Sequence, residues 1–329
     1  MSPDDRVYAY SAVLMGSPIL LKLLEHNQPV AAGVFRLIKQ QENLLTVNRP
    51  DSEVMAINHA AGEHPVVVSQ PVFELIARAR EISLLEGSCF NFTIGPLVKC
   101  WKIGFHGNRV PPAAEIARLL TLTDPRQVIL DRQARSVFLP VKGMEIDLGA
   151  IAKGDIADRV RDFLRQQQIT DALINLGGNV QTLGGMPGSA NWGIGLKKPF
   201  AGPDDLIGVI GISGKSVVTS GIYERYFELA GQRYHHILNP ETGFPLDNEL
   251  LSVTVISPQS IDGDIFTTLL YGMGVEKGLA CLATTPEIEA VFVTKQRQVI
   301  CSSQRQFNFT LLDSSYQLGR NQLSAGRML

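Results

Sequence analysis

The stretch from Thr219 to Pro245 carries more chemically useful side chains than folding alone requires. Two adjacent histidines, His235 and His236, lead there into Asn-Pro-Glu-Thr-Gly-Phe-Pro, a run that must turn. Successive side chains of a strand point to opposite faces, so we expect His235 to be a solvated surface residue that tolerates replacement. An imidazole titrates near neutral pH, and His236 is therefore the candidate general base.

A second candidate is the strand-turn-helix junction at residues 147–154. The strand ends in Asp147-Leu148-Gly149, and we expect a long helix to begin near Gly154. The N–H groups and the positive end of that helix would face the turn, where Lys153 adds a full charge. The pattern predicts an anion site. Its glycine spacing matches neither the Walker loop nor the dinucleotide fingerprint, so we expect no P-loop or Rossmann motif.

Three further segments could let a ligand approach the backbone or line its pocket. Met15-Gly16-Ser17 interrupts the first strand, which indicates a bulge or a close approach to a ligand. Gly177-Gly178-Asn179 follows a buried strand and allows the same approach. The segment around Asn91 is either a buried loop pinned by Trp101 or a loop that lines a ligand.

Asp264 and Thr268 are four residues apart, so they share one face of a helix. Both offer hard oxygen atoms, which suit Mg²⁺. The alternative is that Asp264 caps a helix and that Thr268 bonds back to a backbone carbonyl. Spacing alone favours this second interpretation.

The composition is that of a globular protein with few specialised features. The chain has 329 residues, 45% hydrophobic and 19% charged, with a formal charge of -2. This balance argues against nucleic acid as the main partner. We find no signal peptide and no uninterrupted apolar span, and we therefore expect a cytoplasmic protein without membrane insertion. The four cysteines are expected to be reduced thiols: Cys89, Cys100, Cys281 and Cys301.

The sequence shows no internal repeat and no low-complexity linker, and we expect a single unit over residues 1–329, with two interleaved subdomains as a further possibility. Helical spacing of apolar residues occurs from Val30 and again over 70–86. Gly231 divides two short alternating runs in the manner of a hairpin bend. The tail over 314–329 is expected to be loosely held.

Nine motifs occur in the order found in one known family. The chain resembles the ApbE family of flavin transferases, which move FMN from FAD onto a protein threonine or serine. The resemblance covers nearly the whole chain and implies an α+β fold of mixed, largely antiparallel sheets with packed helices, similar to a T-fold. Its motifs are Met15-Gly16-Ser17, PDSEVMAIN, CFNFTIGPLVKCW, DLGAIAKG, INLGGN, TSGIYERYF, HHILNPETGFP, SVTVIS and the Asp264 to Thr268 pair.

The resemblance also implies roles for individual residues. Mg²⁺ would be held by the backbone carbonyl of Ala150 and by the side chains of Asp264 and Thr268. Lys153 would lie near the FAD diphosphate, and His236 would act as the base or contact the flavin nucleotide. The remaining implied cofactor contacts are Met15, Gly16, Cys89, Phe90, Asn91, Gly177, Gly178, Tyr223 and Ile237.

The implied reaction is Mg²⁺-dependent transfer of FMN from FAD to a Thr or Ser hydroxyl of an acceptor with an FMN-binding domain, with release of AMP. A FAD pyrophosphatase and a flavin-binding protein without turnover are the alternatives. The sequence departs from the family pattern at five positions. We expect these departures to leave the activity intact but to change how the flavin or the acceptor is bound. The family commonly has Tyr, Asp, Tyr, Asp and Asp where this chain has Val47, Asn91, Asp155, Ile222 and Asn239.

Overall fold

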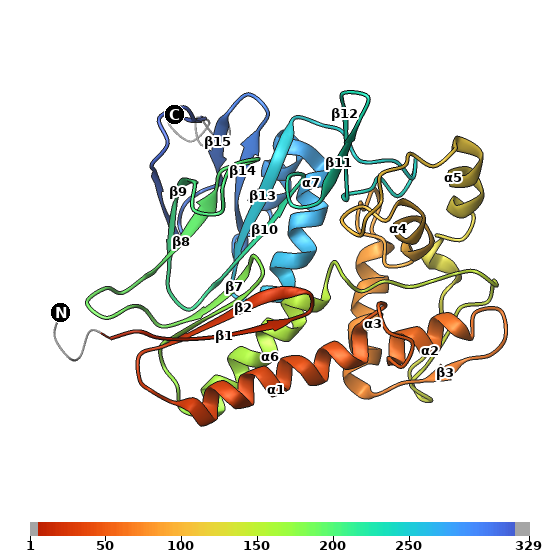
Figure 1. Cartoon of the computed structure of the whole chain (residues 1–329), viewed down its shortest axis with the longest axis horizontal. Coiled ribbons are helices and arrows are strands. Elements are labelled where there is room, and N and C mark those ends of the chain that lie inside the picture. The colour runs from red at the N-terminus through yellow and green to blue at the C-terminus, as the bar shows by residue number, and fades with distance from the viewer. Residues whose placement is uncertain (1–5, 320–329) are drawn as a thin grey trace. The chain divides into compact units, whose positions relative to one another are not determined.

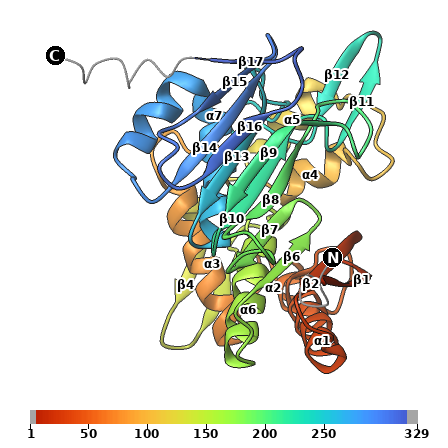
Figure 2. The ribbon, with the colours of Figure 1, turned by 90° about the vertical axis from the view of Figure 1, so that its left-hand side faces the viewer.

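The computed structural model describes residues 6–319 (Figures 1 and 2). The chain forms two compact units, and each is assembled from separate chain segments. The first unit contains residues up to Gln40, then Lys153–Gly221, and then the chain from Asn248 onward. The second unit contains Gln41–Ala152 and Ile222–Asp247.

A nine-stranded sheet forms the centre of the first unit (Figure 1). Neighbouring strands pair antiparallel, except for the parallel pair of β15 and β17. In spatial order the strands are β1 (Tyr8–Leu14), β2 (Ser17–Leu23), β6 (Ala172–Leu176), β7 (Asn179–Leu183), β10 (Ser216–Gly221), β13 (Leu250–Ser257), β14 (Glu289–Thr294), β15 (Gln298–Cys301) and β17 (Gln317–Leu318).

A smaller antiparallel sheet, in the order β16 (Asn308–Leu311), β9 (Leu206–Ile212) and β8 (Trp192–Lys197), belongs to the same unit. Side chains of β8 alternate strictly between buried and exposed, so one face of this sheet is apolar. That face joins the core of the nine-stranded sheet, where Trp192 packs in one cluster with Val217 and Ile256.

Three helices contribute to the first unit: α1 (Gln28–Leu45), α6 (Ala152–Gln166) and α7 (Ser260–Ala283), with α1 passing into the second unit after Gln40. α7 packs on β10 and β13. By length and composition α7 could cross a membrane, but half of its most apolar window is buried inside the fold. Because it also buries the carboxyl group of Asp264, α7 has the character of a core helix.

The second unit combines short helices with small sheets. Its helical elements are α2 (Glu53–His59), α3 (Gln70–Ser83), α4 (Gly95–Trp101), α5 (Ala113–Leu120) and the 3₁₀ turn Pro125–Gln127. Its strands form a sheet in the order β3 (Val66–Val67), β5 (Ser136–Phe138) and β4 (Ile129–Asp131), and the hairpin of β11 (Tyr226–Leu229) and β12 (Gln232–His235). The hairpin packs on α4 through aromatic rings. Phe227 stacks on Tyr234 with ring centroids 5.1 Å apart, and Trp101 contacts both rings.

The predicted fold class is confirmed, because helices pack with mixed, largely antiparallel sheets. Gly95-Pro96 begins α4, since proline fits the first turn of a helix. One local expectation differs from the structure. Within the tail predicted to be loose, Tyr316 is buried and β17 pairs with β15, while residues 320–329 lie outside the described residues.

Candidate active site

Two tight turns of the first unit lie at the same end of the nine-stranded sheet. Met15 and Gly16 join β1 to β2 with φ angles of 53° and 67°, and Gly177 and Gly178 join β6 to β7 with 69° and 101°. Such left-handed pairs are the residues of two-residue hairpin turns, so the bulge expected at Gly16 is wrong. β2 pairs antiparallel with β6, so the start of β2 lies beside the end of β6 and the two turns are neighbours.

Lys153 reaches the second of these turns from the first turn of α6. A Cβ atom built on Gly177 would lie 3.3 Å from Lys153 Nζ and 3.0 Å from Ser17 Cβ. Only glycine therefore leaves room for the ammonium group beside the backbone. The structure thus brings Lys153 together with the glycine turn that sequence reasoning singled out.

Asp264 lies one turn inside α7, whose N-cap is Gln259, so the capping interpretation does not apply. Its buried carboxylate accepts a 2.6 Å hydrogen bond from the Gly154 N–H and a 3.0 Å bond from Asn179 Nδ2. Burial raises the pKa of Asp264 to about 7, against the opposing effect of these bonds and of the Lys153 charge. A carboxylate desolvated to this degree is stabilised by a cation.

Thr268 follows Asp264 on the same face of α7 and is half-buried. Its hydroxyl donates to the Asp264 carbonyl at 3.5 Å, the long limit of a hydrogen bond, whereas Thr267 donates to the same carbonyl at 3.0 Å. The back-bond of Thr268 that the spacing favoured is therefore present, but the hydrogen bond is weak. The Thr268 oxygen keeps lone pairs for a ligand.

The predicted magnesium ligands include a single carboxylate. Ala150 lies in the turn that leads into α6 and belongs to the second unit. Within residues 6–319, no group of three or more His, Cys, Asp or Glu side chains could hold a metal ion by itself. Mg²⁺ accepts such a sparse set, because it commonly keeps waters and takes further oxygens from phosphates.

The two histidines of the second unit have different surroundings. His235 ends β12, is 7% exposed, and contacts the Leu246 carbonyl at 2.8 Å through Nε2. Its Nδ1 accepts the Ile237 N–H at 3.2 Å. The expectation of a solvated His235 is wrong, because the strand ends at this residue and the ring satisfies backbone groups of the following turn.

His236 is half-buried and is held against one backbone carbonyl. Its N–H and its Nδ1 both contact the Arg225 oxygen, at 3.1 and 3.2 Å. In the neutral ring Nδ1–H donates this bond, which leaves the lone pair on Nε2. Burial lowers the pKa of His236 to about 4, and the charges of Arg225 and His235 add to the effect. The pKa of His236 therefore differs from the near-neutral value expected for the candidate base.

The loop Cys89-Phe90-Asn91 also lies in the second unit and is closely held. Asn91 donates to the Thr123 carbonyl at 2.8 Å and accepts the Thr93 N–H at 2.9 Å. Phe90 is buried, and Cys89 is half-buried. Burial, and then the Glu241 charge, raise the pKa of the Cys89 thiol, which places this loop near the turn after His236. Trp101 pins that turn rather than the loop, because its Nε1 donates to the Gly243 carbonyl.

The departures from the family pattern have structural roles of their own. Asn239 accepts the Glu241 N–H at 2.9 Å and closes its turn, as Asn91 does in the earlier loop. Asp155 pairs with Arg159 along α6 at 3.0 Å. Ile222 is a core residue, and Val47 is half-buried.

The last two predicted cofactor residues lie at the ends of the hairpin segment. Tyr223 is half-buried in the turn between β10 and β11. Ile237 is half-buried, and its carbonyl accepts the Leu246 N–H at 2.8 Å. Both belong to the second unit with His236 and the 89–91 loop, whereas the turns at Met15 and Gly177 belong to the first.

Sequence reasoning missed several residues that contact the site. Asn179 was noted only for its backbone, yet its side chain binds Asp264. Ser260, at the first position of α7, has the sequence signature of a helix cap. Arg225 contributes the carbonyl that orients His236, and no spacing rule connects the two.

Residues 15–292 match the model of the ApbE family. Because this match spans most of the sequence, the chain belongs to the ApbE family. A FAD:protein FMN transferase of Klebsiella pneumoniae (strain 342) is 63% identical over 96% of this chain and 98% of its own length. Another of Treponema pallidum (strain Nichols) is 37% identical over 87% and 83%.

Solved structures agree with the sequence comparison. The ApbE protein of Thermotoga maritima superposes with a TM-score of 0.80 at 29% identity and covers 91% of this chain and 98% of its own. The flavinyl transferase ApbE of Pseudomonas stutzeri, in its apo form, gives 0.76 at 28% identity, with 94% and 95% coverage. The family resemblance read from the motifs is confirmed.

Proposed function

We propose that this protein transfers FMN from FAD to a threonine or serine hydroxyl of an acceptor protein and releases AMP. The observation that carries the proposal is the buried Asp264 carboxylate, which lies on α7 in a chain 63% identical to a FAD:protein FMN transferase over nearly the full length of both. The enzyme class is that of these relatives, and FAD is the substrate.

The reaction is a displacement at phosphorus. The acceptor oxygen forms a bond to the phosphorus nearest the flavin, the bond from that phosphorus to the bridging oxygen breaks, and AMP leaves with the bridging oxygen. Such transfers depend mainly on positioning and charge neutralisation. Lys153, at the Gly177 turn, supplies a positive charge for the diphosphate.

Asp264, Thr268 and the Ala150 carbonyl are the residues that would hold Mg²⁺. The fit is supported by the carboxylate itself, because burial raises the pKa of Asp264 to about 7 and a bound cation would restore its charged form. When bound, Mg²⁺ supplies Lewis-acid stabilisation of the phosphate oxygens.

His236 is the residue that would take the proton of the acceptor hydroxyl. Its ring is neutral above pH 4, and its Nδ1–H bond to the Arg225 carbonyl directs the lone pair to Nε2. A positioned base contributes about 10²- to 10⁴-fold. A weaker base takes a proton less readily, so with a pKa near 4 the contribution of His236 is expected at the lower end of this range.

The acceptor is proposed to be a flavoprotein with an FMN-binding domain in the cytoplasm or facing it. All four cysteines are free, which is typical of proteins kept in a reducing compartment.

The test is incubation with FAD and Mg²⁺, with and without an FMN-acceptor domain. Covalent flavin fluorescence on the acceptor, with an equal amount of AMP, is the expected result. Rapid release of FMN and AMP without acceptor would identify a pyrophosphatase. FAD binding without any AMP would identify a flavin-binding protein and would contradict the proposal.

A further inference from the structure

A continuous chain of buried hydrogen bonds ends on Asp264. Ser216 Oγ donates to Ser260 Oγ at 2.9 Å, Ser260 Oγ donates to Asn179 Oδ1 at 2.6 Å, and Asn179 Nδ2 donates to Asp264 Oδ1 at 3.0 Å. The four side chains come from β10, α7 and β7, all within the first unit, and each is buried. We call this set the Asp264 relay.

Every hydrogen bond of the Asp264 relay is donated toward Asp264. Ser216 donates its hydrogen bond to Ser260, so the Ser260 hydroxyl is free to donate onward to the amide oxygen of Asn179. That contact turns the amide nitrogen toward Asp264, whose ionised carboxylate has acceptor oxygens and no donor. A flipped amide would place its own oxygen against the carboxylate and lose the bond to Asp264. The Ser260 hydroxyl donates to the amide oxygen and so supports the orientation in which the amide nitrogen meets Asp264.

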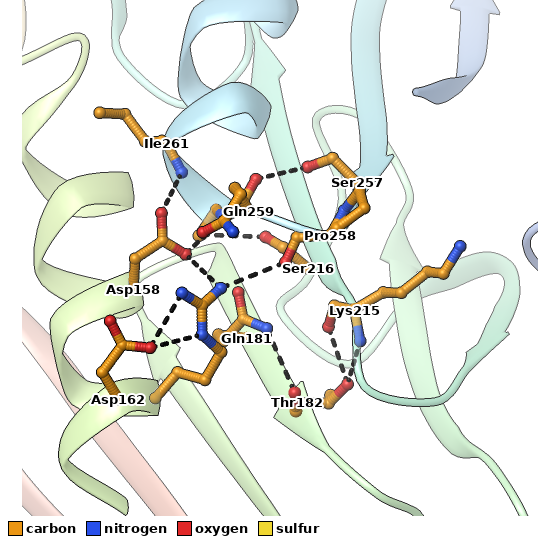
Figure 3. A network of polar contacts seen from close by, with 12 residues as sticks. Asp158, Asp162, Gln181, Thr182, Lys215, Ser216, Ser257, Pro258, Gln259 and Ile261 are labelled. Carbon is orange, nitrogen blue, oxygen red and sulfur yellow. Dashed lines mark hydrogen bonds and ion pairs between the residues drawn. The ribbon is translucent and has the colours of Figure 1, made fainter. Parts of the chain in front are cut away.

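Ser260 is itself held in place through its backbone. Asp158, on α6, accepts the Ser260 N–H at 2.7 Å and the Ile261 N–H at 3.0 Å, and Figure 3 shows its carboxylate at the first turn of α7. Arg161 donates to Asp158 at 3.1 Å and to the Pro258 carbonyl at 3.3 Å. This network ties the start of α7 to α6.

Close packing at Gly154 completes the arrangement. A Cβ atom at this position would lie 2.6 Å from Ile261 Cα and 2.9 Å from Asp264 Oδ2. The missing side chain lets the Gly154 N–H reach the second carboxylate oxygen at 2.6 Å. Each oxygen of Asp264 thus accepts one N–H bond, and the carboxylate plane is fixed from two sides.

We propose that Asn179 and Ser260 are positioning residues of the transfer reaction, which hold the Asp264 carboxylate in the orientation that binds the divalent cation. This inference rests on the proposed function. Partners that orient a ligating carboxylate typically change metal affinity or activity by about 10- to 100-fold when removed. Ser260 acts through Asn179, so the two losses should not add.

The test compares wild type, Asn179→Ala, Ser260→Ala and the double variant at saturating FAD. Two readouts give the half-maximal Mg²⁺ concentration: AMP release, and the rise in melting temperature of the FAD-bound chain. We expect each single variant to need about 10- to 100-fold more Mg²⁺. We also expect the double variant to match Asn179→Ala, and kcat at saturating Mg²⁺ to stay near that of wild type.

Ser252→Ala is the matched control, since Ser252 is fully buried and its hydroxyl has no hydrogen-bond partner among residues 6–319. It should keep the wild-type Mg²⁺ requirement. A wild-type requirement in a folded Asn179→Ala, additive losses in the double variant, or an equal loss in Ser252→Ala would overturn the inference. If Ser260→Ala does not fold, Asn179→Ala decides alone. A wild-type chain without Mg²⁺-dependent AMP release would instead contradict the proposed function.

Discussion

The surroundings of Asp264 and of His236 are built in opposite ways. Asp264 lies inside a long helix, and side-chain and backbone donors from α6 and β7 fix both of its oxygens. His236 follows the end of a four-residue strand and is oriented by one carbonyl of a turn. Regular elements thus hold the group that we propose to bind a cation, and a turn holds the group that we propose to accept a proton.

Burial shifts the two groups in opposite directions, because it always disfavours the charged form. It raises the pKa of Asp264 to about 7 and lowers the pKa of His236 to about 4. Without metal, both groups are therefore biased toward neutrality at physiological pH. The comparison predicts that the first region depends on a cation and that the second does not.

The largest effect is expected from Asp264→Asn, which keeps the volume of the side chain and removes its charge. Loss of a metal ligand forfeits several kcal/mol of charge stabilisation, so Mg²⁺-dependent AMP release should fall by about 10³-fold or more. Each oxygen of Asp264 accepts an N–H bond, so the new amide nitrogen would face one of these donors, and the melting temperature should fall moderately without loss of the fold. Normal turnover, or a chain that no longer folds, would remove Asp264 from the cation site.

A loss of about 10²-fold in FMN transfer is expected for His236→Ala, with unchanged affinity for FAD and Mg²⁺. The measurement is a single-turnover rate together with FAD binding. If FAD affinity falls in proportion to the rate, His236 is a flavin contact and not the base.

The pH profile of the wild-type enzyme also tests the role proposed for His236. Only the neutral ring accepts a proton, and the folded pKa of His236 is about 4, below its ordinary value. Its contribution to kcat/KM should therefore be constant from pH 8 to pH 5 and decline only as the pH falls toward 4. A decline centred near pH 6.5 that disappears in His236→Ala would contradict the buried, low-pKa assignment.

A smaller effect is expected for Lys153→Ala. Charge-assisted hydrogen bonds contribute about 1.5–3 kcal/mol, so FAD affinity should weaken by about 10- to 100-fold, with little change in melting temperature. Lys277→Ala, at an exposed position on α7, is a matched loss of charge and should bind FAD as wild type does. Equal affinities for the two variants would exclude Lys153 from the diphosphate site.

The smallest catalytic effect is expected for His235→Ala, which instead lowers stability. Removal of the ring leaves the Leu246 carbonyl and the Ile237 N–H without this partner, at a cost of about 1–3 kcal/mol. Denaturant unfolding measures the loss, and activity per folded molecule should remain close to that of wild type. A stable but inactive variant would exchange the roles assigned to the two histidines.

Motifs that act through local backbone were predictable from the sequence. The Gly231 hairpin and the helix start, which was predicted near Gly154 and lies at Ala152, both follow from short-range rules. The partners of Asp264 and Ser260 were not predictable, because Asn179 and Asp158 lie 85 and 102 residues away in sequence. The exposure of His235 was misjudged for a related reason: alternation along a strand does not show where the strand ends.

The measurement that tests the central claim most directly is the reaction with FAD, Mg²⁺ and an acceptor domain in ¹⁸O-labelled water, followed by mass spectrometry of all products. Attack by the acceptor hydroxyl predicts unlabelled AMP and an unlabelled phosphodiester on the acceptor, formed in equal amounts. Labelled free FMN would show that water attacks the phosphorus nearest the flavin, and labelled AMP would show attack at the other phosphorus. Either result as the main product would contradict the account.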